Sequence, residues 1–87
     1  MVALAMSTRA KLAQLLVRWA KEEGQRTPEG TRILVTMTHE AIGESIGASR
    51  ETVSRLLADF KRHGMIRVKG GAIVILRPEA LLSFSAS

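Results

Sequence analysis

One stretch, residues 38–63 (THEAIGESIGASRETVSRLLADFKRH), constrains the fold more than any other part of the chain. Thr38 is a favourable N-cap for a first short helix, and Gly47 supplies the left-handed residue with which helices often end. Ser49, two positions later, is a second N-cap. The chain therefore ends one helix and begins another within a sharp turn, which is typical of a helix-turn-helix.

The second predicted helix, residues 49–63, separates apolar from polar side chains. Its apolar residues follow the i, i+3, i+4, i+7 spacing of a buried stripe, and they are Val53, Leu56, Leu57 and Phe60. Charged side chains fall on the opposite side of this helix. In the first helix, Gly43 is the small residue expected where the two helices approach each other. The pattern predicts that the second helix packs on the first and exposes a charged face.

Three charged residues of the second helix, Arg50, Glu51 and Arg55, are candidates for reading DNA bases. A recognition helix contacts base edges with its N-terminal residues. Arginine can donate two hydrogen bonds to guanine, and glutamate can accept one from cytosine. The alternative is that Glu51 and Arg55 form only a surface ion pair, worth about 0.3–0.5 kcal/mol. The sharp turn and the basic chain together favour base reading.

The segments IGESIGA (42–48) and SRETVSRLL (49–57) resemble the helix-turn-helix of the CRP/FNR superfamily of bacterial transcription regulators. The resemblance extends over roughly residues 7–82. It implies an α+β winged helix-turn-helix, with a three-helix core and a small antiparallel β-wing. It also implies that the chain is the C-terminal DNA-binding half of a larger sensor.

The resemblance offers two patterns of base-reading residues. In CRP-like members the readers are Arg, Glu and Arg, which match Arg50, Glu51 and Arg55 and imply a TGTGA-type half-site. In FNR-like members they are Glu, Ser and Arg, which match Glu51, Ser54 and Arg55. The FNR-like pattern usually lacks an arginine at the position of Arg50, so we favour the CRP-like site. Ser54 is then a fourth candidate reader, and the first bases of the half-site stay open.

Other residues are expected to hold DNA phosphates through hydroxyls, helix N-terminal amides or positive charge. These are Thr38, Ser49, Thr52, Arg62 and Lys69. Lys69 precedes Gly70-Gly71, a strong hairpin signal between predicted strands at 65–69 and 72–76. This hairpin would be the wing, with Lys69 at its tip. The alternative for Lys69 is a charged hairpin that contacts only solvent.

The remaining segments are predicted to build the core around these elements. A helix is expected from residue 7 or 8 to Glu23, with Trp19 on its apolar stripe rather than exposed as a base-stacking platform. A polar loop at 25–31 and a strand at 32–37 should follow. A short helix beginning at Pro78 should pack through Leu81 and Leu82, before a frayed tail at 84–87. Residues 1–6 are expected to be the end of a dimerisation helix or the start of a cut chain.

Composition limits the classes of function. The 87 residues allow one domain, residues 7–83, and the net charge of +5 suits a polyanionic partner. The chain has no cysteine, which excludes disulfides and cysteine-ligated metals, and no cofactor is expected in this domain. No apolar run approaches the roughly 20 residues of a membrane span, so we expect a cytoplasmic protein without a membrane partner.

Double-stranded DNA is the expected partner. A homodimer is expected for the full-length protein, RNA polymerase is a further candidate partner, and the effector of the sensor is open.

Three other functions fit the sequence less well than DNA binding. Catalysis is disfavoured because His39 and His63 are far apart in sequence and no metalloprotease, phosphate-loop or serine-elbow motif is present. A winged helix used for protein contact would present an apolar or acidic recognition helix, whereas Arg50, Arg55 and Arg62 are basic. Sequence-specific RNA binding is disfavoured because such modules stack bases on exposed aromatics, of which this chain has few. The sequence therefore predicts DNA binding, with protein contact as the alternative.

Overall fold

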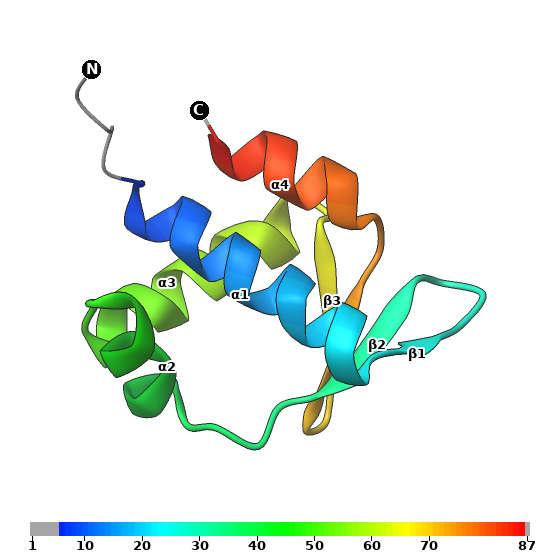
Figure 1. Cartoon of the computed structure of the whole chain (residues 1–87), viewed down its shortest axis with the longest axis horizontal. Helices are drawn as coiled ribbons and strands as arrows, with labels where there is room; N and C mark the ends of the chain where they lie inside the picture. The colour runs from blue at the N-terminus through cyan, green and yellow to red at the C-terminus, as the bar shows by residue number, and fades with distance from the viewer. Residues whose placement is uncertain (1–5, 87) are drawn as a thin grey trace.

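The computed structural model describes residues 6–86, which fold into four helices and four strands (Figure 1). In chain order these are α1 (Thr8–Glu23), β1 (Gln25–Arg26), β2 (Thr31–Leu34), α2 (His39–Ile46), α3 (Arg50–Arg62), β3 (Ile66–Lys69), β4 (Ala72–Ile75) and α4 (Pro78–Ala86). The α+β winged helix-turn-helix predicted from the sequence is confirmed. Most of the segment expected to end a dimerisation helix, residues 1–5, lies outside the described residues. None of the helices in residues 6–86 is both long and apolar enough to cross a membrane.

The helix-turn-helix forms with the caps that the sequence predicts. The Thr38 hydroxyl accepts a hydrogen bond from the Ala41 amide at 3.0 Å, and α2 begins at the next residue. Gly47 ends α2 with a φ of +73°, which a residue with a side chain rarely adopts. The Ser49 hydroxyl then accepts from the Thr52 amide at 3.1 Å and starts α3. These local bonds fix the turn between the two helices.

Gly43 lies where α2 approaches the turn that follows it. A Cβ atom built on Gly43 would be 2.3 Å from the carbonyl oxygen of Ala48, a distance that no real Cβ tolerates. The Ala48 amide donates to the Gly43 carbonyl at 2.8 Å. The close approach is therefore between α2 and the backbone of the turn, and glycine permits it.

Replacing Gly43 with alanine is expected to lower the free energy of unfolding by about 1–3 kcal/mol, because the backbone must shift to relieve the contact. Urea unfolding monitored by circular dichroism measures this loss. Gly71→Ala is the matched control, since a Cβ at Gly71 meets nothing within 4 Å. An equal loss for both variants would contradict the steric role of Gly43.

The sheet has the strand order β1-β2-β4-β3, and all its neighbours are antiparallel. The β3–β4 hairpin is the predicted wing, and β2 pairs with β4 along its whole length. Both wing strands are one residue shorter than predicted. The predicted strand 32–37 occupies residues 31–34, and the expected loop at 25–31 contains β1. On β3, Val68 is 47% exposed, whereas Ile66 is 1% exposed.

Helices α1 and α4 lie side by side over the core (Figure 1). Leu12, Leu16, Phe60 and Leu81 are fully buried at 0% exposure, as their apolar spacing predicts. Trp19 is half-buried and packs against the core, so its predicted place on the apolar stripe is confirmed.

The C-terminal segment is ordered where a frayed tail was expected. Helix α4 continues to Ala86, and Ser85 is buried. The Phe84 ring meets the Phe60 ring edge to face, with centroids 6.2 Å apart. It also lies 4.8 Å from the His63 ring. Aromatic contacts of this kind stabilise the helix end, so the predicted fraying is wrong for residues 84–86.

Candidate nucleic-acid interface

The four candidate base readers lie on the exposed face of α3. Arg50, Glu51, Ser54 and Arg55 are all exposed, whereas Val53 between them is completely buried. They occupy the first turn and a half of the helix, next to the capped turn at Ser49. The structure therefore brings together, on one rigid element, the side chains that the sequence assigned to base reading.

An ion pair forms between neighbours rather than across one helical turn. The Arg50 guanidinium is 3.6 Å from the Glu51 carboxylate, and both side chains are more than 60% exposed, at 65% and 77%. The ion pair that the sequence offered as an alternative joined Glu51 to Arg55; among the described residues, the recorded partner of Glu51 is Arg50. An exposed pair of this kind contributes little stability. Both groups can exchange it for contacts to bases at small cost.

The hydroxyls predicted to hold phosphates take part in the caps. Thr38 and Ser49 cap α2 and α3, and the Ser49 hydroxyl also donates to Thr52 Oγ1 at 2.9 Å. They stand at the two helix N-termini, where backbone amides favour anions. Arg62 is at the other end of α3 and forms an ion pair with Asp59. Four of the five predicted phosphate contacts thus lie along the helix-turn-helix.

The fifth, Lys69, has a carboxylate partner that the sequence did not indicate. The Lys69 ammonium donates to Glu29 Oε1 at 2.7 Å, and the Arg67 guanidinium is 3.4 Å from Glu29 Oε2. Glu29 lies in the turn between β1 and β2, forty residues from Lys69 in sequence. The hydrogen bond and charge of Lys69, with a smaller contribution from Arg67, lower the pKa of Glu29 below its ordinary value of 4.5. The wing lysine is therefore held by an anion of its own chain.

Glu29→Gln is expected to reduce stability slightly near neutral pH and to reduce it less in acid. A carboxyl whose pKa is lower in the folded chain stabilises the fold above its unfolded pKa, and that contribution disappears as pH falls through the folded pKa. The difference in melting temperature between wild type and Glu29→Gln should be present at about pH 7 and smaller at about pH 3, because the lowered folded pKa of Glu29 lies below 4.5. Glu22→Gln, which removes the same charge from the exposed end of α1, is the control. A constant difference at both pH values would contradict this pairing.

One contact across the helix-turn-helix was missed from the sequence. His39 Nδ1 lies 2.7 Å from Ser54 Oγ, and both residues are exposed. The two residues are fifteen positions apart, and no local spacing relates them. The contact depends on the angle between α2 and α3, so only the fold reveals it.

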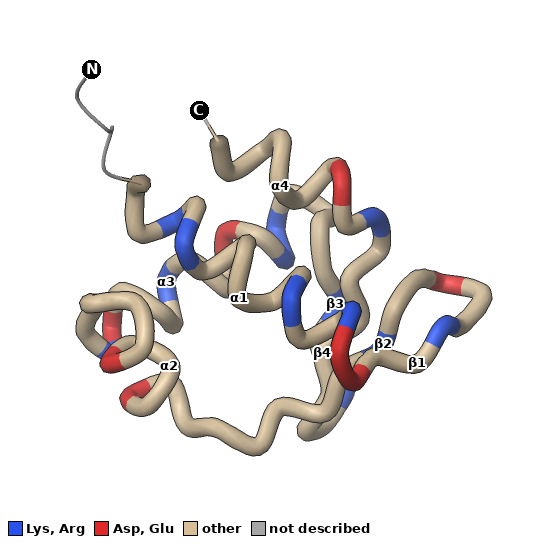
Figure 2. Tube along the Cα trace, in the orientation of Figure 1, with Lys and Arg blue, Asp and Glu red and all other residues tan. Residues whose placement is uncertain are grey.

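Positive charge is spread over several elements (Figure 2). Lysine and arginine occur on α1, α3 and β3, among other places, and α3 alone carries Arg50, Arg55, Lys61 and Arg62. A basic recognition helix suits a polyanion and does not fit the acidic or apolar surface that a protein-contact module would present.

In the described chain, groups of three or more histidine, cysteine, aspartate or glutamate side chains able to bind a metal are absent.

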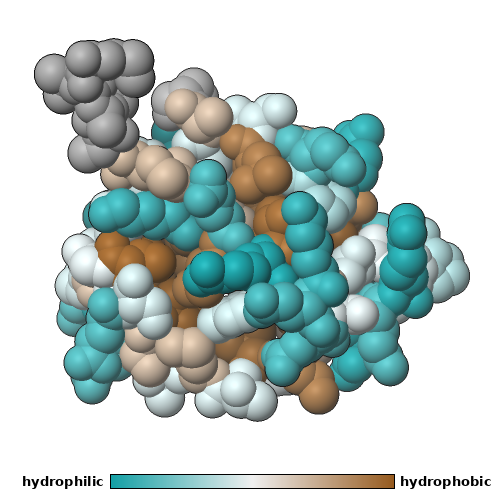
Figure 3. All heavy atoms as spheres, viewed as in Figure 1, coloured by the Kyte–Doolittle hydropathy of each residue, from teal (hydrophilic) through white to brown (hydrophobic). Residues whose placement is uncertain are grey.

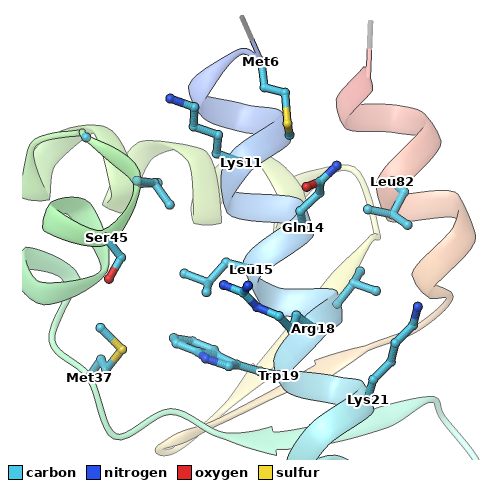
Figure 4. A pocket seen from close by; sticks show the side chains of 13 residues that line it. Met6, Lys11, Gln14, Leu15, Arg18, Trp19, Lys21, Met37, Ser45 and Leu82 are labelled. Atoms are coloured by element: carbon cyan, nitrogen blue, oxygen red, sulfur yellow. The ribbon is translucent and has the colours of Figure 1, made fainter.

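A concave surface lies away from the candidate base readers. It is a groove of about 870 Å³ lined by α1, α2, the segment before α2 and Leu82 of α4. Trp19 on α1 points toward Met37 there, with Leu15 and Ser45 nearby (Figure 4). Figure 3 shows hydrophobic surface between hydrophilic side chains on the face that α1 presents to the viewer. Because α3 contributes no residue to the lining, this groove is separate from the recognition face.

Comparisons with known proteins point to one family. The sequence profile of the Crp-like helix-turn-helix domain matches residues 10–84. The global nitrogen regulator of Synechocystis sp. is 36% identical over 72 residues, which are 83% of this chain and 32% of that protein. The CRP-like cAMP-activated global transcriptional regulator of Mycobacterium tuberculosis is 37% identical over 71 residues, or 82% of this chain and 32% of that protein.

A solved structure agrees with these sequence matches. The CO-dependent transcription factor CooA from Carboxydothermus hydrogenoformans superposes with a TM-score of 0.80 at 34% identity, covering 91% of this chain and 37% of that one. All three relatives are transcription regulators rather than enzymes, which agrees with the prediction that this chain is not an enzyme. The chain spans about a third of the length of the curated relatives it matches.

Proposed function

The chain belongs to the CRP/FNR family of transcription regulators, as a Crp-like helix-turn-helix DNA-binding domain, and from this we propose that α3 reads a TGTGA-type half-site in the major groove. The observation that carries the proposal is the exposed set Arg50, Glu51 and Arg55 on the first turns of α3. They project from a helix whose start is fixed by the Ser49 cap. A recognition helix reads bases with this part of its surface.

Each reader has a role set by its hydrogen-bonding groups. Arg50 and Arg55 can each donate two bonds to guanine O6 and N7, and the Glu51 carboxylate can accept from cytosine N4. Inserting α3 into the groove replaces the Arg50–Glu51 ion pair with these contacts. Ser54, one turn along the helix, is a fourth reader that can donate or accept.

Phosphate contacts position the helix without reading sequence. Thr38, Ser49 and Thr52 stand at the beginnings of α2 and α3, and Arg62 at the end of α3. Lys69 on the wing donates one hydrogen bond to the Glu29 carboxylate, and its ammonium has two further N–H donors that could bind a phosphate.

The wider setting of the domain follows from the same proposal. A domain with one recognition helix gains affinity when a dimer engages two half-sites about 34 Å apart, so we propose a homodimer in the full-length protein. A DNA ligand is consistent with the cytoplasmic location expected from the sequence, and contact with RNA polymerase fits a regulator of transcription.

The proposal is tested by titrating the protein into two fluorescent duplexes, one with a TGTGA palindrome and one with a scrambled sequence. Fluorescence anisotropy measures the affinity for each duplex at two salt concentrations. Preference for the palindrome, lost in Glu51→Ala, is the expected result, because Glu51 is assigned to a base. Equal and steeply salt-dependent binding to both duplexes would reject the half-site and retain DNA binding through phosphates. Absence of binding at low salt would favour the alternative of a winged helix used for protein contact.

A further inference from the structure

We infer that the groove of about 870 Å³ along α1 and α2 is a docking site for an acidic amphipathic helix of a partner protein. Two observations carry the inference. Apolar side chains in the groove stay partly exposed, and a row of cations beside them has no anionic partner among the described residues. The groove is separate from the recognition face of α3, so the inference goes beyond the proposed function and does not depend on the half-site.

Apolar side chains from three segments form the floor of the groove. Leu15 and Trp19 come from α1, Met37 from the segment before α2, and Ile46 from the end of α2. Leu15 and Ile46 are buried, whereas Trp19 and Met37 are only half-buried and lie toward each other (Figure 4). Tryptophan and methionine are enriched at protein interfaces, because the indole buries a large area and the thioether adapts to its neighbours. A ligand that covers both side chains removes apolar surface from water.

A row of basic side chains runs along the exposed face of α1 beside this floor. Lys11, Arg18 and Lys21 line the groove and are exposed. Their spacing, with Gln14 between the first two, keeps them on one face of the helix over about 15 Å. Among the described residues that line the groove, none is acidic. Within residues 6–86 these three cations form no ion pair, and the pairs that do form involve α3 and the wing.

The charge of the row identifies the chemistry of the ligand. A partner that covers the floor also comes close to several unpaired cations, and carboxylates on its flanks complement them. Charge complementarity of this kind selects among partners and speeds association. The backbone of a DNA duplex would supply negative charge, but it has no apolar surface to cover Trp19 and Met37. The combination of floor and row therefore favours an acidic protein segment over a nucleic acid.

The secondary structure around the groove favours a helical ligand. An extended segment binds by adding to an open strand edge, and the edge strands of the sheet are β1 and β3. Neither strand contributes a residue to the groove, which is bordered mainly by helices. An amphipathic helix in such a groove inserts apolar residues at i, i+3 or i+4, and i+7. About three turns of it span the row of cations.

The groove and the DNA-binding residues use different parts of the helix-turn-helix. Residues 45–47 at the C-terminal end of α2 line the groove, whereas Thr38, proposed to hold a phosphate, is at the N-terminal end. Helix α3 contributes no residue to the lining. A partner helix and a duplex therefore contact separate elements, and a domain bound to DNA can hold the partner at the same site.

The first experiment uses Trp19 as the reporter, because it is the single tryptophan of the chain. The probe is a synthetic helical peptide of about 16 residues, long enough to form a helix, with leucine on one face, glutamate along both flanks and no tryptophan. Titration into the protein should shift Trp19 emission to shorter wavelength and saturate. A peptide with glutamine in place of glutamate should bind roughly tenfold more weakly. Absence of a response, or equal affinity for the two peptides, would overturn the inference.

Charge-reversal variants locate the binding. Arg18→Glu should weaken binding of the acidic peptide by roughly tenfold or more. Arg77→Glu is the matched control, since it makes the same change in net charge at an exposed residue outside the groove. It should bind the peptide like the wild type, and circular dichroism checks that both variants are folded. Equal losses in the two variants would mean that only net charge attracts the peptide, which would overturn the inference.

Two further measurements test other occupants of the groove. Trp19 emission of the protein alone should be independent of protein concentration, and a shift on concentration would assign the groove to a second copy of the chain. A scrambled DNA duplex should not displace the acidic peptide, and displacement would assign the cations to phosphate binding. Either contrary result would overturn the inference. Because peptide binding is measured without DNA, failure of the TGTGA preference would reject the proposed half-site and leave the docking site standing.

Discussion

Alanine in place of Phe60 is expected to lower the free energy of unfolding by about 3–5 kcal/mol, the usual cost of truncating a buried phenylalanine. Phe60 is 0% exposed and is the largest fully buried side chain among the described residues. Its ring also meets Phe84 edge to face, so the substitution loosens the end of α4. A small domain is stabilised by only about 5–15 kcal/mol in total, and the variant should begin to unfold at a much lower urea concentration.

Leu34→Ala serves as the control for that experiment. Leu34 is also a large apolar residue, but it is 64% exposed, so its truncation removes little buried surface. A change within about 0.5 kcal/mol is expected for such a surface position. Similar losses in the two variants would mean that Phe60 is not part of the folded core in solution.

Arg55→Ala is expected to weaken binding to the cognate half-site by about 1–3 kcal/mol and to relax specificity at one base pair. Under the proposed function, the substitution removes two hydrogen bonds that Arg55 donates to a single guanine. Competition titrations against duplexes altered at each position measure both effects. Arg50→Ala is a less direct test, because removing Arg50 also releases Glu51 from its ion pair.

Lys69→Ala provides the contrast for Arg55→Ala. A residue that contacts phosphate should weaken binding to all duplexes by a similar factor and reduce the salt dependence. Losses that are equal on every duplex for Arg55→Ala would instead assign Arg55 to the phosphate backbone. The two variants together therefore separate base reading from electrostatic attraction.

The elements set by local chemistry could be predicted from the sequence. Thr38, Gly47 and Ser49 carry capping and turn preferences within a few residues of where they act, so both helix starts and the sharp turn were found. The buried stripe of α3 was found because its spacing alone determines its face. Strand β1 was missed because Gln25–Arg26 has neither β-branched residues nor alternation, and its pairing depends on β2.

The contacts that could not be predicted join residues that are distant in sequence. Lys69 was placed correctly at the end of a wing strand. Its partner Glu29 lies in the turn between β1 and β2, and only the folded chain brings that turn close to Lys69. The same applies to His39 and Ser54. The ordered end of α4 was missed because Phe84 lies close to the C-terminus, where chains often fray, and its contact with Phe60 is not visible in the sequence.

The pairing of β2 with β4 has a consequence for how the domain assembles. These strands flank the helix-turn-helix in the chain, so their antiparallel ladder from Thr31↔Ile75 to Leu34↔Ala72 closes a loop that contains α2 and α3. Closing a long loop costs chain entropy before any contact forms. Folding should therefore be cooperative, with the amides of β2, β4 and α3 becoming protected from hydrogen exchange together. A substitution that weakens the pairing of β2 with β4 would then raise the rate at which α3 unfolds locally, although the substituted residue lies outside α3.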